Sequence, residues 1–427
     1  MTESQEKPTK KYTKHTKLKP FEEMMTHALN DEKLNNLIAY NELKHNYQFI
    51  KDFEGIKAGT YFEDIHMAVL KWYFVRVHDI QLSEVLLTQF MQLEGIKHVI
   101  NPIKDWLKNI KWDGTPRLST WLSDYTSCVD NSYTRQVGRL LLCGAIRRIM
   151  EPGCKFDYMI IFEGEQGTKK STLFEILGGD YYISLSFGQY EKEIVENIQG
   201  AWFIEIADMN GFKKQEIEWL RAFITRRSDR CRLPYARTSG DFSRQNIFVA
   251  TTNPSGDNEY LKDDTGNRRF LPILTGKLDI DKLRFNRDQL FAEAYSNYKT
   301  ELLYLTGEAE HIAKEEQESR EEKDIWLRPV QVFINSKRVT NISEILKDCL
   351  HIDIARASLY DKVRVGKIMK KLKWNRVQNK YGEREYYNPN GHTDDIDPAG
   401  DSILQIAKPV YAVESRTGSQ QDIDWEA

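Results

Sequence analysis

The fold of the central part of the chain is decided by residues 158–179, which read YMIIFEGEQGTKKSTLFEILGG. The first six residues are an apolar run bounded by a turn, as in a buried strand. Polar, glycine-containing residues follow at 164–171 and predict a loop. The run STLFEIL then predicts a helix that ends at Gly178 and Gly179. A strand, a loop and a helix in this order form the context in which a glycine-containing loop can surround phosphate groups.

The loop fits three of the four fixed positions of the phosphate-binding pattern G-x-x-x-x-G-K-[ST], because Lys169 occupies the second glycine position. In such a loop, backbone N–H groups and the helix N-terminus surround the phosphates, a lysine contacts the β and γ oxygens, and a hydroxyl ligates Mg²⁺. A side chain at the second glycine costs roughly 1–2 kcal/mol, and Gly167 supplies part of the required backbone freedom. We expect ATP and Mg²⁺ as ligands, with nucleotide contacts from Gly164, Gln166, Gly167, Thr168, Lys169, Lys170, Ser171 and Thr172.

Later motifs add polar side chains suited to phosphate chemistry. The apolar run AWFIEIAD carries Glu205 and Asp208, either of which could hold magnesium or orient an attacking water, unless both are solvated acids at a strand edge. The run NIFVATTN ends in Asn253, whose amide could hydrogen-bond a γ-phosphate, although asparagine is also a common turn residue. Arg268 and Arg269 follow on a turn and either neutralise transition-state charge or form surface salt bridges.

Two segments are strongly basic, although the whole chain has a formal net charge of -3. Residues 221–237 contain six arginines, one acid and interleaved aromatic residues, which favours nucleic-acid contact over a solvated helix face. Residues 361–384 contain nine bases and two acids on an amphipathic pattern, which predicts a basic helix in a winged-helix unit or in a partner-binding module. We expect DNA contacts from Arg226, Arg227, Arg230, Arg232, Arg237, Lys367, Lys370 and Lys371.

Composition divides the chain into five parts. Residues 1–20 hold six lysines and two glutamates and predict a disordered basic tail. Apolar positions recur every three or four residues in 21–150, which predicts a helical N-terminal domain. Short apolar runs alternate with helical stretches in 151–325, which predicts an α/β domain with a parallel sheet. The winged-helix-like unit is expected at 326–390 and a disordered acidic tail at 391–427.

The composition also excludes several classes of protein. With 40% hydrophobic and 29% charged residues, the chain is neither fibrous nor wholly disordered. No apolar run approaches the roughly 18 residues that span a bilayer, so we expect no membrane partner and a cytoplasmic location. Five scattered cysteines without a CxxC pair predict neither disulfides nor structural zinc. Trp106, Trp112 and Trp121 are expected to anchor a core.

Taken in order, these motifs resemble the virulence-associated protein E family, ATPases of phages and phage-like chromosomal islands that are related to superfamily 3 helicases and to AAA+ ATPases. The resemblance extends from about Asn41 to Tyr387. Its carriers are WDGTPRL, PGCKFDYMIIFEGEQGTKKST, WFIEIADM, ITRRSDRCRLPYAR, VATTN and DDTGNRRFLPI. It implies a homo-oligomeric ring, expected to be a hexamer, in which the arginine-rich segment is a DNA-contacting hairpin and Arg268 or Arg269 reaches a neighbour's site.

We therefore expect an ATP-dependent DNA helicase or translocase, acting on single-stranded DNA and on origin duplex, in replication of a phage or mobile island. The expected catalytic residues are Lys170, Glu205, Asp208, Asn253, Arg268 and Arg269, with Ser171 and Glu205 on the metal. The alternative is a DNA-binding initiation or regulatory protein without motor activity, whose nucleotide site is degenerate at Lys169. A metabolic nucleotide kinase would fit the loop but would leave both basic segments unexplained.

Overall fold

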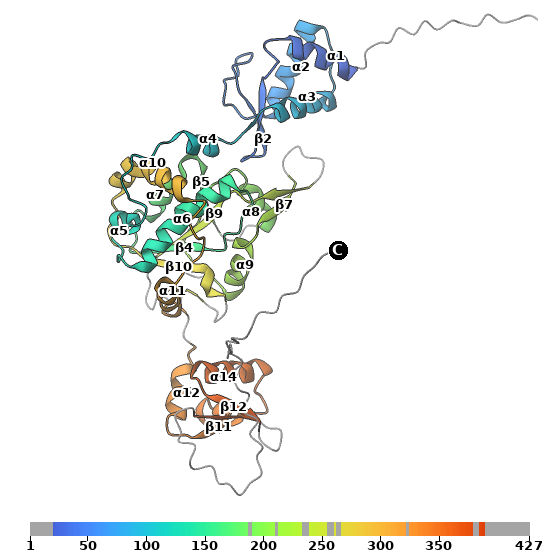
Figure 1. The fold of residues 1–427 in the computed structure, drawn as a ribbon. Helices are drawn as coiled ribbons and strands as arrows, with labels where there is room; N and C mark the ends of the chain where they lie inside the picture. Colours follow the sequence, from blue (N-terminus) through green and yellow to red (C-terminus); the bar gives the residue numbers. More distant parts are fainter. Residues whose placement is uncertain are drawn as a thin grey trace, which may run out of the picture. The chain divides into compact units, whose positions relative to one another are not determined.

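The computed structural model describes residues 20–186, 190–209, 212–232, 239–253, 260–261, 266–321, 324–378 and 384–388. The chain forms two compact units, Met1–Glu322 and Lys323–Ala427 (Figure 1). Apart from Pro20, the tails expected at 1–20 and 391–427 lie outside the described residues. None of the helices in the described ranges has the length and apolar character of a bilayer-crossing segment.

The larger unit begins with a small α/β layer that has its own core. Its three strands are ordered β2-β1-β3, with β1 antiparallel to β2 and parallel to β3. The sequence pattern predicted helices here but not these strands, because a strand of two to four residues is too short to show an alternating pattern. The elements are α1 (Pro20–Asn30), β1 (Ile38–Asn41), β2 (Asn46–Phe49), α2 (Asp64–His78), α3 (Glu84–Lys97) and β3 (Val99–Ile100).

A five-stranded parallel sheet forms the centre of this unit, in the order β10-β4-β9-β6-β5. All five strands are short apolar runs, and β4 lies second in the sheet, between β10 and β9. The mixed α/β fold with a parallel sheet therefore agrees with the fold class that the sequence indicated. The strands are β4 (Met159–Glu163), β5 (Tyr182–Leu185), β6 (Phe203–Ile206), β9 (Ile247–Thr252) and β10 (Phe270–Leu274).

Helices cover both faces of the sheet because alternate residues of each strand point to opposite sides. Ile160 and Phe162 of β4 belong to one hydrophobic core, whereas Met159 and Ile161 belong to another. The first core includes side chains of α4, α5, α6, α7, α10 and α11, and the second includes side chains of α8 and α9. These helices are α4 (Pro102–Asn109), α5 (Trp121–Thr126), α6 (Ser132–Met150), α7 (Lys170–Gly178), α8 (Glu191–Asn197), α9 (Lys214–Ile224), α10 (Ile280–Asn297) and α11 (Glu308–Glu318).

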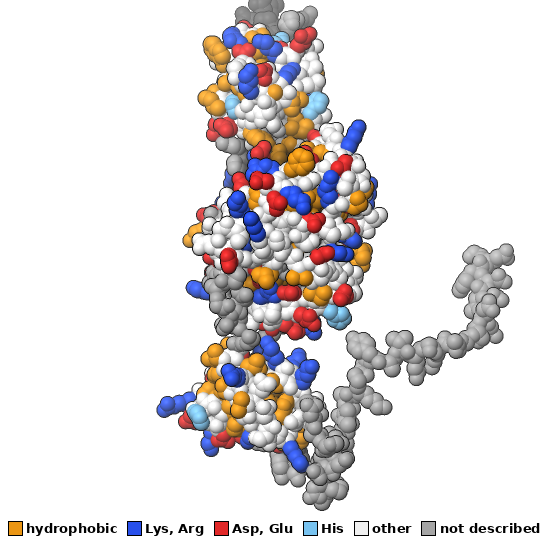
Figure 2. Space-filling model, turned by 90° about the vertical axis from the view of Figure 1, so that its left-hand side faces the viewer, with side chains coloured by type: hydrophobic (Ala, Val, Ile, Leu, Met, Phe, Trp, Pro, Cys, Tyr) orange, Lys and Arg blue, Asp and Glu red, His pale blue; other side chains and the backbone are white. Residues whose placement is uncertain are grey.

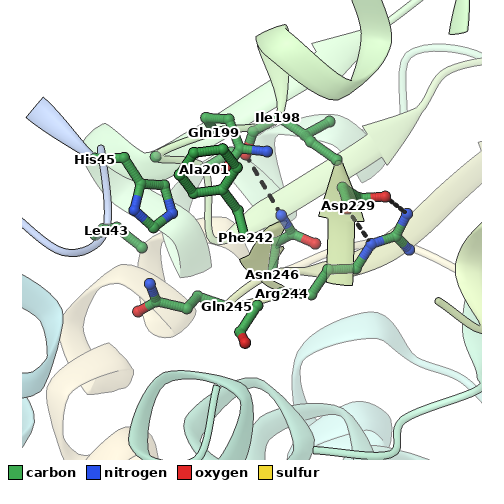
Figure 3. A pocket seen from close by; sticks show the side chains of 12 residues that line it. Leu43, His45, Ile198, Gln199, Ala201, Asp229, Phe242, Arg244, Gln245 and Asn246 are labelled. Atoms are coloured by element: carbon green, nitrogen blue, oxygen red, sulfur yellow. Dashed lines mark hydrogen bonds and ion pairs between the residues drawn. The ribbon is translucent and has the colours of Figure 1, made fainter. Parts of the chain in front are cut away.

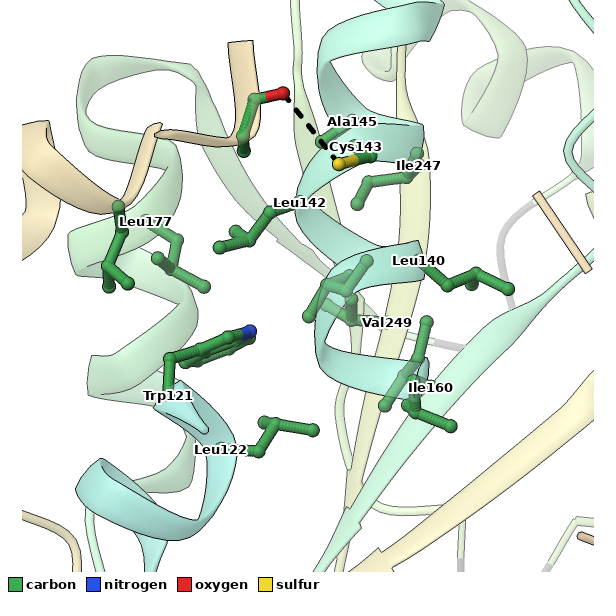
Figure 4. Close-up of a cluster of buried hydrophobic side chains, with 14 of the residues drawn as sticks. Trp121, Leu122, Leu140, Leu142, Cys143, Ala145, Ile160, Leu177, Ile247 and Val249 are labelled. Carbon is green, nitrogen blue, oxygen red and sulfur yellow. Dashed lines mark hydrogen bonds between the residues drawn. The ribbon is translucent and has the colours of Figure 1, made fainter. Parts of the chain in front are cut away.

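Helix α6 corrects the expected boundary at residue 150. Its side chains Leu140 and Leu142 are buried in the same core as Ile160 of β4 and Val249 of β9 (Figure 4). The helical periodicity of α6 was predicted, but periodicity alone does not show against which neighbour a helix packs. Trp121 is fully buried and Trp106 is partly buried in this core, as expected, whereas Trp112 is 39% exposed and does not anchor it.

A two-stranded antiparallel hairpin, β7 (Ser228–Cys231) with β8 (Gly240–Ser243), projects from the α/β core. At its base Arg244 donates to both carboxylate oxygens of Asp229, and both side chains are about 1% exposed (Figure 3). The ring of Phe242 lies 4.5 Å, centre to centre, from the imidazole of His45 in the loop between β1 and β2. The small N-terminal layer therefore contacts the base of this hairpin.

The smaller unit contains helices on one three-stranded antiparallel sheet of order β11-β13-β12. Buried side chains of α12, the π-helix η3 and α14, among them Val330, Leu346 and Ile368, form its core with Trp374 and Tyr386. Its elements are α12 (Leu327–Ile334), β11 (Val339–Asn341), α13 (Ile342–Glu344), η3 (Ile345–Cys349), α14 (Leu359–Lys371), β12 (Asn375–Gln378) and β13 (Arg384–Tyr387).

Candidate functional site

The loop between β4 and α7 passes through left-handed backbone twice. Gly167 has φ of 83°, and Lys169, directly before α7, has φ of 68°. A Cβ atom at Gly164 would lie 2.7 Å from Oγ1 and 3.1 Å from the carbonyl oxygen of Thr275, so any larger residue here would require Thr275 to shift. The loop thus depends on special backbone positions, in agreement with its glycine-containing sequence.

Lys169 adopts the conformation for which the sequence pattern demands glycine. A left-handed backbone at a residue with a side chain costs roughly 1–2 kcal/mol. Its side chain is exposed and therefore needs no space inside the loop. Gly167 was expected to supply part of the backbone freedom that a glycine at position 169 would give. Gly167 does have a positive φ, but Lys169 has a positive φ as well. The departure from the pattern is accommodated by a left-handed backbone at a residue that carries a side chain.

Lys170 begins α7 and turns its side chain back over the loop. The residue is 7% exposed, and its Nζ donates to the carbonyl oxygens of Gly164 at 2.7 Å and Glu165 at 2.9 Å. Nζ also donates to Oδ1 of Asn253 at 3.0 Å. Burial lowers the pKa of Lys170, while the carboxylates of Glu205 and Asp208 act in the opposite direction. The ammonium group is therefore held among oxygen atoms of the loop and of Asn253.

Glu205 lies at the centre of a cluster of hydroxyl groups. Its carboxylate is fully buried and accepts hydrogen bonds from Oγ of Ser171 at 2.7 Å and from Oγ1 of Thr251 at 2.5 Å. Its second oxygen accepts from the hydroxyl of Tyr182. Burial raises the pKa of Tyr182, and the hydrogen bond to Glu205 acts in the same direction. Three hydroxyl donors from three different elements thus hold one carboxylate beside the first turn of α7.

Sequence analysis identified Ser171 and Glu205 but missed Thr251 and Tyr182. Thr251 belongs to the VATTN motif and could have been found there, two residues before Asn253. Tyr182 carried no such signal, because its contact depends on the register in which β5 pairs with β6, with Tyr182 opposite Phe203.

Asp208 and Asn253 follow the carboxyl ends of β6 and β9. Asp208 is exposed and has φ of 50°, so its position beyond the strand depends on a left-handed turn. Asn253 is half-buried and accepts its hydrogen bond from Lys170. The two acids that the sequence left equivalent therefore occupy different environments. Glu205 is buried against Ser171, whereas Asp208 reaches solvent at the sheet edge.

The remaining residues of the loop differ in exposure. Thr168 donates to the carbonyl oxygen of Glu165 at 2.8 Å, Gln166 is exposed, and Thr172 is half-buried. A pocket of about 750 Å³ adjoins the loop on the side of β10. Its lining is formed by Gly164, Glu165, Gly167, Thr168 and Lys169 and by Leu274, Thr275, Gly276, Lys277 and Leu278. The oxygen donors Ser171 and Glu205 have the chemistry that Mg²⁺ prefers, so these residues fit a magnesium ion.

Arg268 and Arg269, which were expected to reach a neighbouring subunit's site, lie at the opposite end of the sheet from the loop. They belong to the 3₁₀ turn η2 (Asn267–Arg269), which leads directly into β10. Strand β10 runs parallel to β4, with Phe270 opposite Met159 and Leu274 opposite Glu163. Arg268 is exposed and Arg269 half-buried. Within one subunit, these side chains are therefore not brought together with Lys170.

The arginines of residues 221–237 serve different purposes. Arg221 is buried and donates to Oδ1 of Asn267 at 2.8 Å. Arg226 pairs with Glu191 at 2.7 Å, and Arg227 donates to the carbonyl oxygen of Gly153. Arg230 of β7 and Arg232 are exposed on the hairpin, and Arg237 lies outside the described residues. Only part of this charge therefore faces solvent, so the arginines expected to contact DNA differ in exposure.

The lysines of the second basic segment are distributed differently. Lys367, Lys370 and Lys371 of α14 are all exposed, while Val365 and Ile368 on the opposite face of the helix are buried. Arg364 is engaged within the unit, since it pairs with Asp324 at 2.8 Å and stacks over Trp326. Figure 2 shows Lys and Arg side chains projecting from the surface of this smaller unit.

Comparison with known protein families adds a decisive observation. The model of the virulence-associated protein E-like domain matches residues 107–322, half of the chain. The chain belongs to the virulence-associated protein E-like family. The matched range of this virulence-associated protein E-like chain begins within α4, so it includes α5 and α6 together with the sheet. The resemblance inferred from the motifs is thereby confirmed.

The solved structures that match the chain are only distantly similar to it. The A form apo structure of the NrS-1 C-terminal region has a TM-score of 0.45 and 11% identity to this virulence-associated protein E-like chain, covering 82% of it and 95% of that chain. An apo structure of the same region, residues 305–718, has a TM-score of 0.42 and 9% identity with the same coverage. No curated protein matches the chain.

Proposed function

We propose that this virulence-associated protein E-like chain is an ATP-dependent DNA helicase or translocase in replication of a phage or phage-like island, acting in the bacterial cytoplasm. The observation that carries the proposal is the convergence of Lys170, Ser171, Glu205 and Asn253 at one sheet edge through direct hydrogen bonds. These residues come from three separate sequence motifs. A solvated lysine-rich turn would not require such an arrangement.

The order of the strands sets the direction of the nucleotide. Asn253 and Glu205 follow or belong to β9 and β6, on one side of β4, whereas the 750 Å³ pocket lies on the side of β10. The γ-phosphate therefore points toward Asn253, and the nucleoside occupies the pocket. Leu274, which is 58% exposed at the end of β10, gives that pocket an apolar wall for a base.

Each residue of the cluster has a separate task. Lys170 exchanges its contacts with the loop carbonyls for β and γ phosphate oxygens. Ser171 and Glu205 would hold Mg²⁺, which when bound neutralises phosphate charge. Asp208, exposed at the sheet edge, orients the attacking water, and Asn253 hydrogen-bonds the γ-phosphate. The buried position of Glu205 favours the metal role for it and leaves the water to Asp208.

A ring of subunits completes the site in this proposal. Arg268 and Arg269 lie at the opposite end of the sheet from Lys170, so they can serve a loop only in a neighbouring copy. A head-to-tail arrangement, which we expect to be a hexamer, brings the turn of one subunit to the loop of the next. The arginines then stabilise charge that develops on the transferred phosphoryl group.

Two surfaces would contact DNA. Arg230 and Arg232 of the hairpin would contact single-stranded DNA. The hairpin is connected directly to β9, so a shift of β9 on ATP hydrolysis would move the hairpin. The smaller unit has the element order helix, strand, helix, helix and a β12–β13 hairpin, and this order supports the proposal of a winged-helix unit. Its helix α14 presents Lys367, Lys370 and Lys371 to duplex DNA.

The test is ATP hydrolysis by the full chain with and without single-stranded DNA over a series of salt concentrations. Lys170→Ala is expected to abolish DNA-stimulated turnover because it removes the phosphate-binding ammonium group. Lys169→Gly is the matched control, since it restores the usual glycine and relieves backbone strain; turnover is expected to be retained. Unchanged hydrolysis in Lys170→Ala would refute the proposal.

The competing function is a non-motor, DNA-binding initiation or regulatory protein. The strained Lys169 and the contacts of Lys170 with loop carbonyls are the observations that favour it, because a degenerate loop could hold itself closed. Tight binding of duplex DNA without ATP turnover, in both the unsubstituted chain and Lys169→Gly, would decide for this alternative.

A further inference from the structure

The C-terminal end of α11 and the residues that follow it contact both ends of the parallel sheet. Gln317 in the last turn of α11 donates to the backbone carbonyl oxygen of Phe270 at 2.9 Å. Arg320 and Glu321, directly beyond the helix, contact the root of the phosphate loop and the arginine turn, respectively. Arg320 and Glu321 thus connect the phosphate loop with the arginine turn. In the proposed mechanism, these two parts of one subunit act in two different active sites.

Arg320 holds the residue from which the loop starts. Glu163 is the last residue of β4 and is 2% exposed. Nε and Nη2 of Arg320 donate to its two carboxylate oxygens at 2.7 and 2.6 Å, and the hydroxyl of Tyr260 donates to one of them at 2.6 Å. A forked contact of this kind fixes orientation as well as distance. The direction in which Gly164 leaves the strand is therefore tied to Arg320.

Glu321 holds the turn that presents the arginines. Oε1 of Glu321 accepts from Nδ2 of Asn267 at 3.1 Å, and Oδ1 of Asn267 accepts from Arg221 of α9 at 2.8 Å. Asn267 is 5% exposed and is the first residue of the turn that carries Arg268 and Arg269. Its amide is thus held on both sides. Glu321 therefore contacts the turn that carries the arginines through the side chain of Asn267.

We propose that Arg320 and Glu321 are positioning residues that couple the phosphate loop of a subunit to the arginine turn of the same subunit. The inference rests on the proposed function, because that function places the loop and the turn in two different active sites. Tightening of the loop around ATP shifts Glu163, and Arg320 transmits this shift to Glu321 and Asn267. The nucleotide state of one site thereby adjusts the arginines that serve the next.

The first experiment compares three variants of the full chain. Glu321→Ala is expected to lower kcat about tenfold while ATP affinity stays unchanged, because only the turn is released. Glu321→Gln is expected to keep most of the activity, since its side-chain oxygen can still accept from Asn267. Glu318→Ala is the matched control; Glu318 lies at the end of the same helix and contacts Lys314 on the surface at 3.7 Å. It is expected to behave like the unsubstituted chain.

Mixing two kinds of variant subunit distinguishes a defect in the phosphate loop from a defect in the arginine turn. Lys170→Ala subunits have a defective loop but an intact turn, so mixing them with Glu321→Ala subunits should restore turnover at interfaces that combine the two intact parts. Arg320→Lys loses one of the two contacts to Glu163 and damages the loop of its own subunit. It should bind ATP more weakly and gain nothing from Lys170→Ala. Absence of rescue for Glu321→Ala, or equal loss of affinity and turnover, would overturn the assignment.

Hydrogen exchange provides a readout that is independent of hydrolysis. Amides of residues 267–270 should exchange faster in Glu321→Ala than in the unsubstituted chain and in Glu318→Ala. Unchanged exchange there would overturn the inference even if turnover fell. If the unsubstituted chain does not hydrolyse ATP, the proposed function fails, and the exchange result then decides alone whether Glu321 holds the turn.

Discussion

The sheet edge around Lys170 and the arginine-rich segment around the hairpin show opposite relations between sequence motif and structure. At the sheet edge, residues from three distant motifs converge through hydrogen bonds on Glu205 and Lys170. In residues 221–237, arginines that are close in sequence lie in different environments. Arg221 is buried, Arg226 pairs with Glu191, and Arg230 remains exposed. Motif order along the chain anticipated which residues meet in the first region, whereas charge density did not show which arginines of the second region are exposed.

The difference has a physical origin. Parallel strands deliver their carboxyl ends to one edge, so residues that follow them are brought together by the architecture. Side chains on a helix followed by a hairpin point in several directions, and a buried or half-buried arginine must find acceptors wherever it lies. The following substitutions test whether the first region acts as a unit and whether the second divides as described.

The largest effect is expected from the two acids of the sheet edge. Asp208→Asn should lower ATP turnover at least about 100-fold without changing Mg²⁺-dependent nucleotide binding, because only water orientation is lost. Glu205→Gln should impair Mg²⁺-dependent binding as well. Steady-state hydrolysis and Mg²⁺ titrations of nucleotide binding measure the two effects. Equal behaviour of the two variants would contradict their separate roles.

The second prediction divides the arginine-rich segment. Replacement of Arg230 and Arg232 together by alanine should weaken single-stranded DNA binding about tenfold and reduce the slope of log K against log salt by about 1.4. Arg226→Ala should leave DNA binding nearly unchanged and lower Tm by about 2 °C or less, because its ion pair with Glu191 is partly exposed. Binding isotherms at several salt concentrations and thermal melts distinguish these results. Equal loss of DNA binding in both proteins would show that the segment acts as one surface.

A smaller effect is expected at Tyr182, which the sequence did not reveal. Tyr182→Phe removes one of the three hydroxyl donors to Glu205 and should lower turnover about fivefold at limiting Mg²⁺, with recovery at high Mg²⁺. Tyr181→Phe removes the same group one residue earlier, on a side chain that packs against the main core, and serves as the control. A loss of turnover that high Mg²⁺ does not restore would show that Tyr182 acts otherwise than by orienting Glu205.

The last prediction concerns stability rather than activity, at the contact between the N-terminal layer and the hairpin. Burial lowers the pKa of His45 from 6.5 to about 4. Between these values the unfolded chain binds the proton and the folded chain does not, so this residue's contribution to stability is lost as pH falls from about 6.5 toward 4. At pH 5 the loss is on the order of 2 kcal/mol. His45→Phe should reduce the difference in Tm between pH 7 and pH 5; an unchanged difference would exclude His45 as its source.

The sequence by itself determined the parallel α/β class, the strand–loop–helix of residues 158–179 and the family, because these depend on local periodicity and on fixed spacings within one segment. It also singled out Lys170 and Ser171 from the loop pattern, and Glu205 and Asn253 because they lie in or directly after an apolar strand. Helix α6 shows its limit. Its periodicity was visible, but its place against β4 and β9 was not.

Only the tertiary structure decided which groups meet. The register of β5 against β6 brings Tyr182 to Glu205, and the parallel pairing of β10 with β4 carries Arg268 away from Lys170. The contacts of Glu163 with Arg320 and of Asn267 with Glu321 join residues far apart along the chain. Such pairings arise from packing between elements, and no local pattern in the sequence encodes the distance between two side chains that lie on different elements.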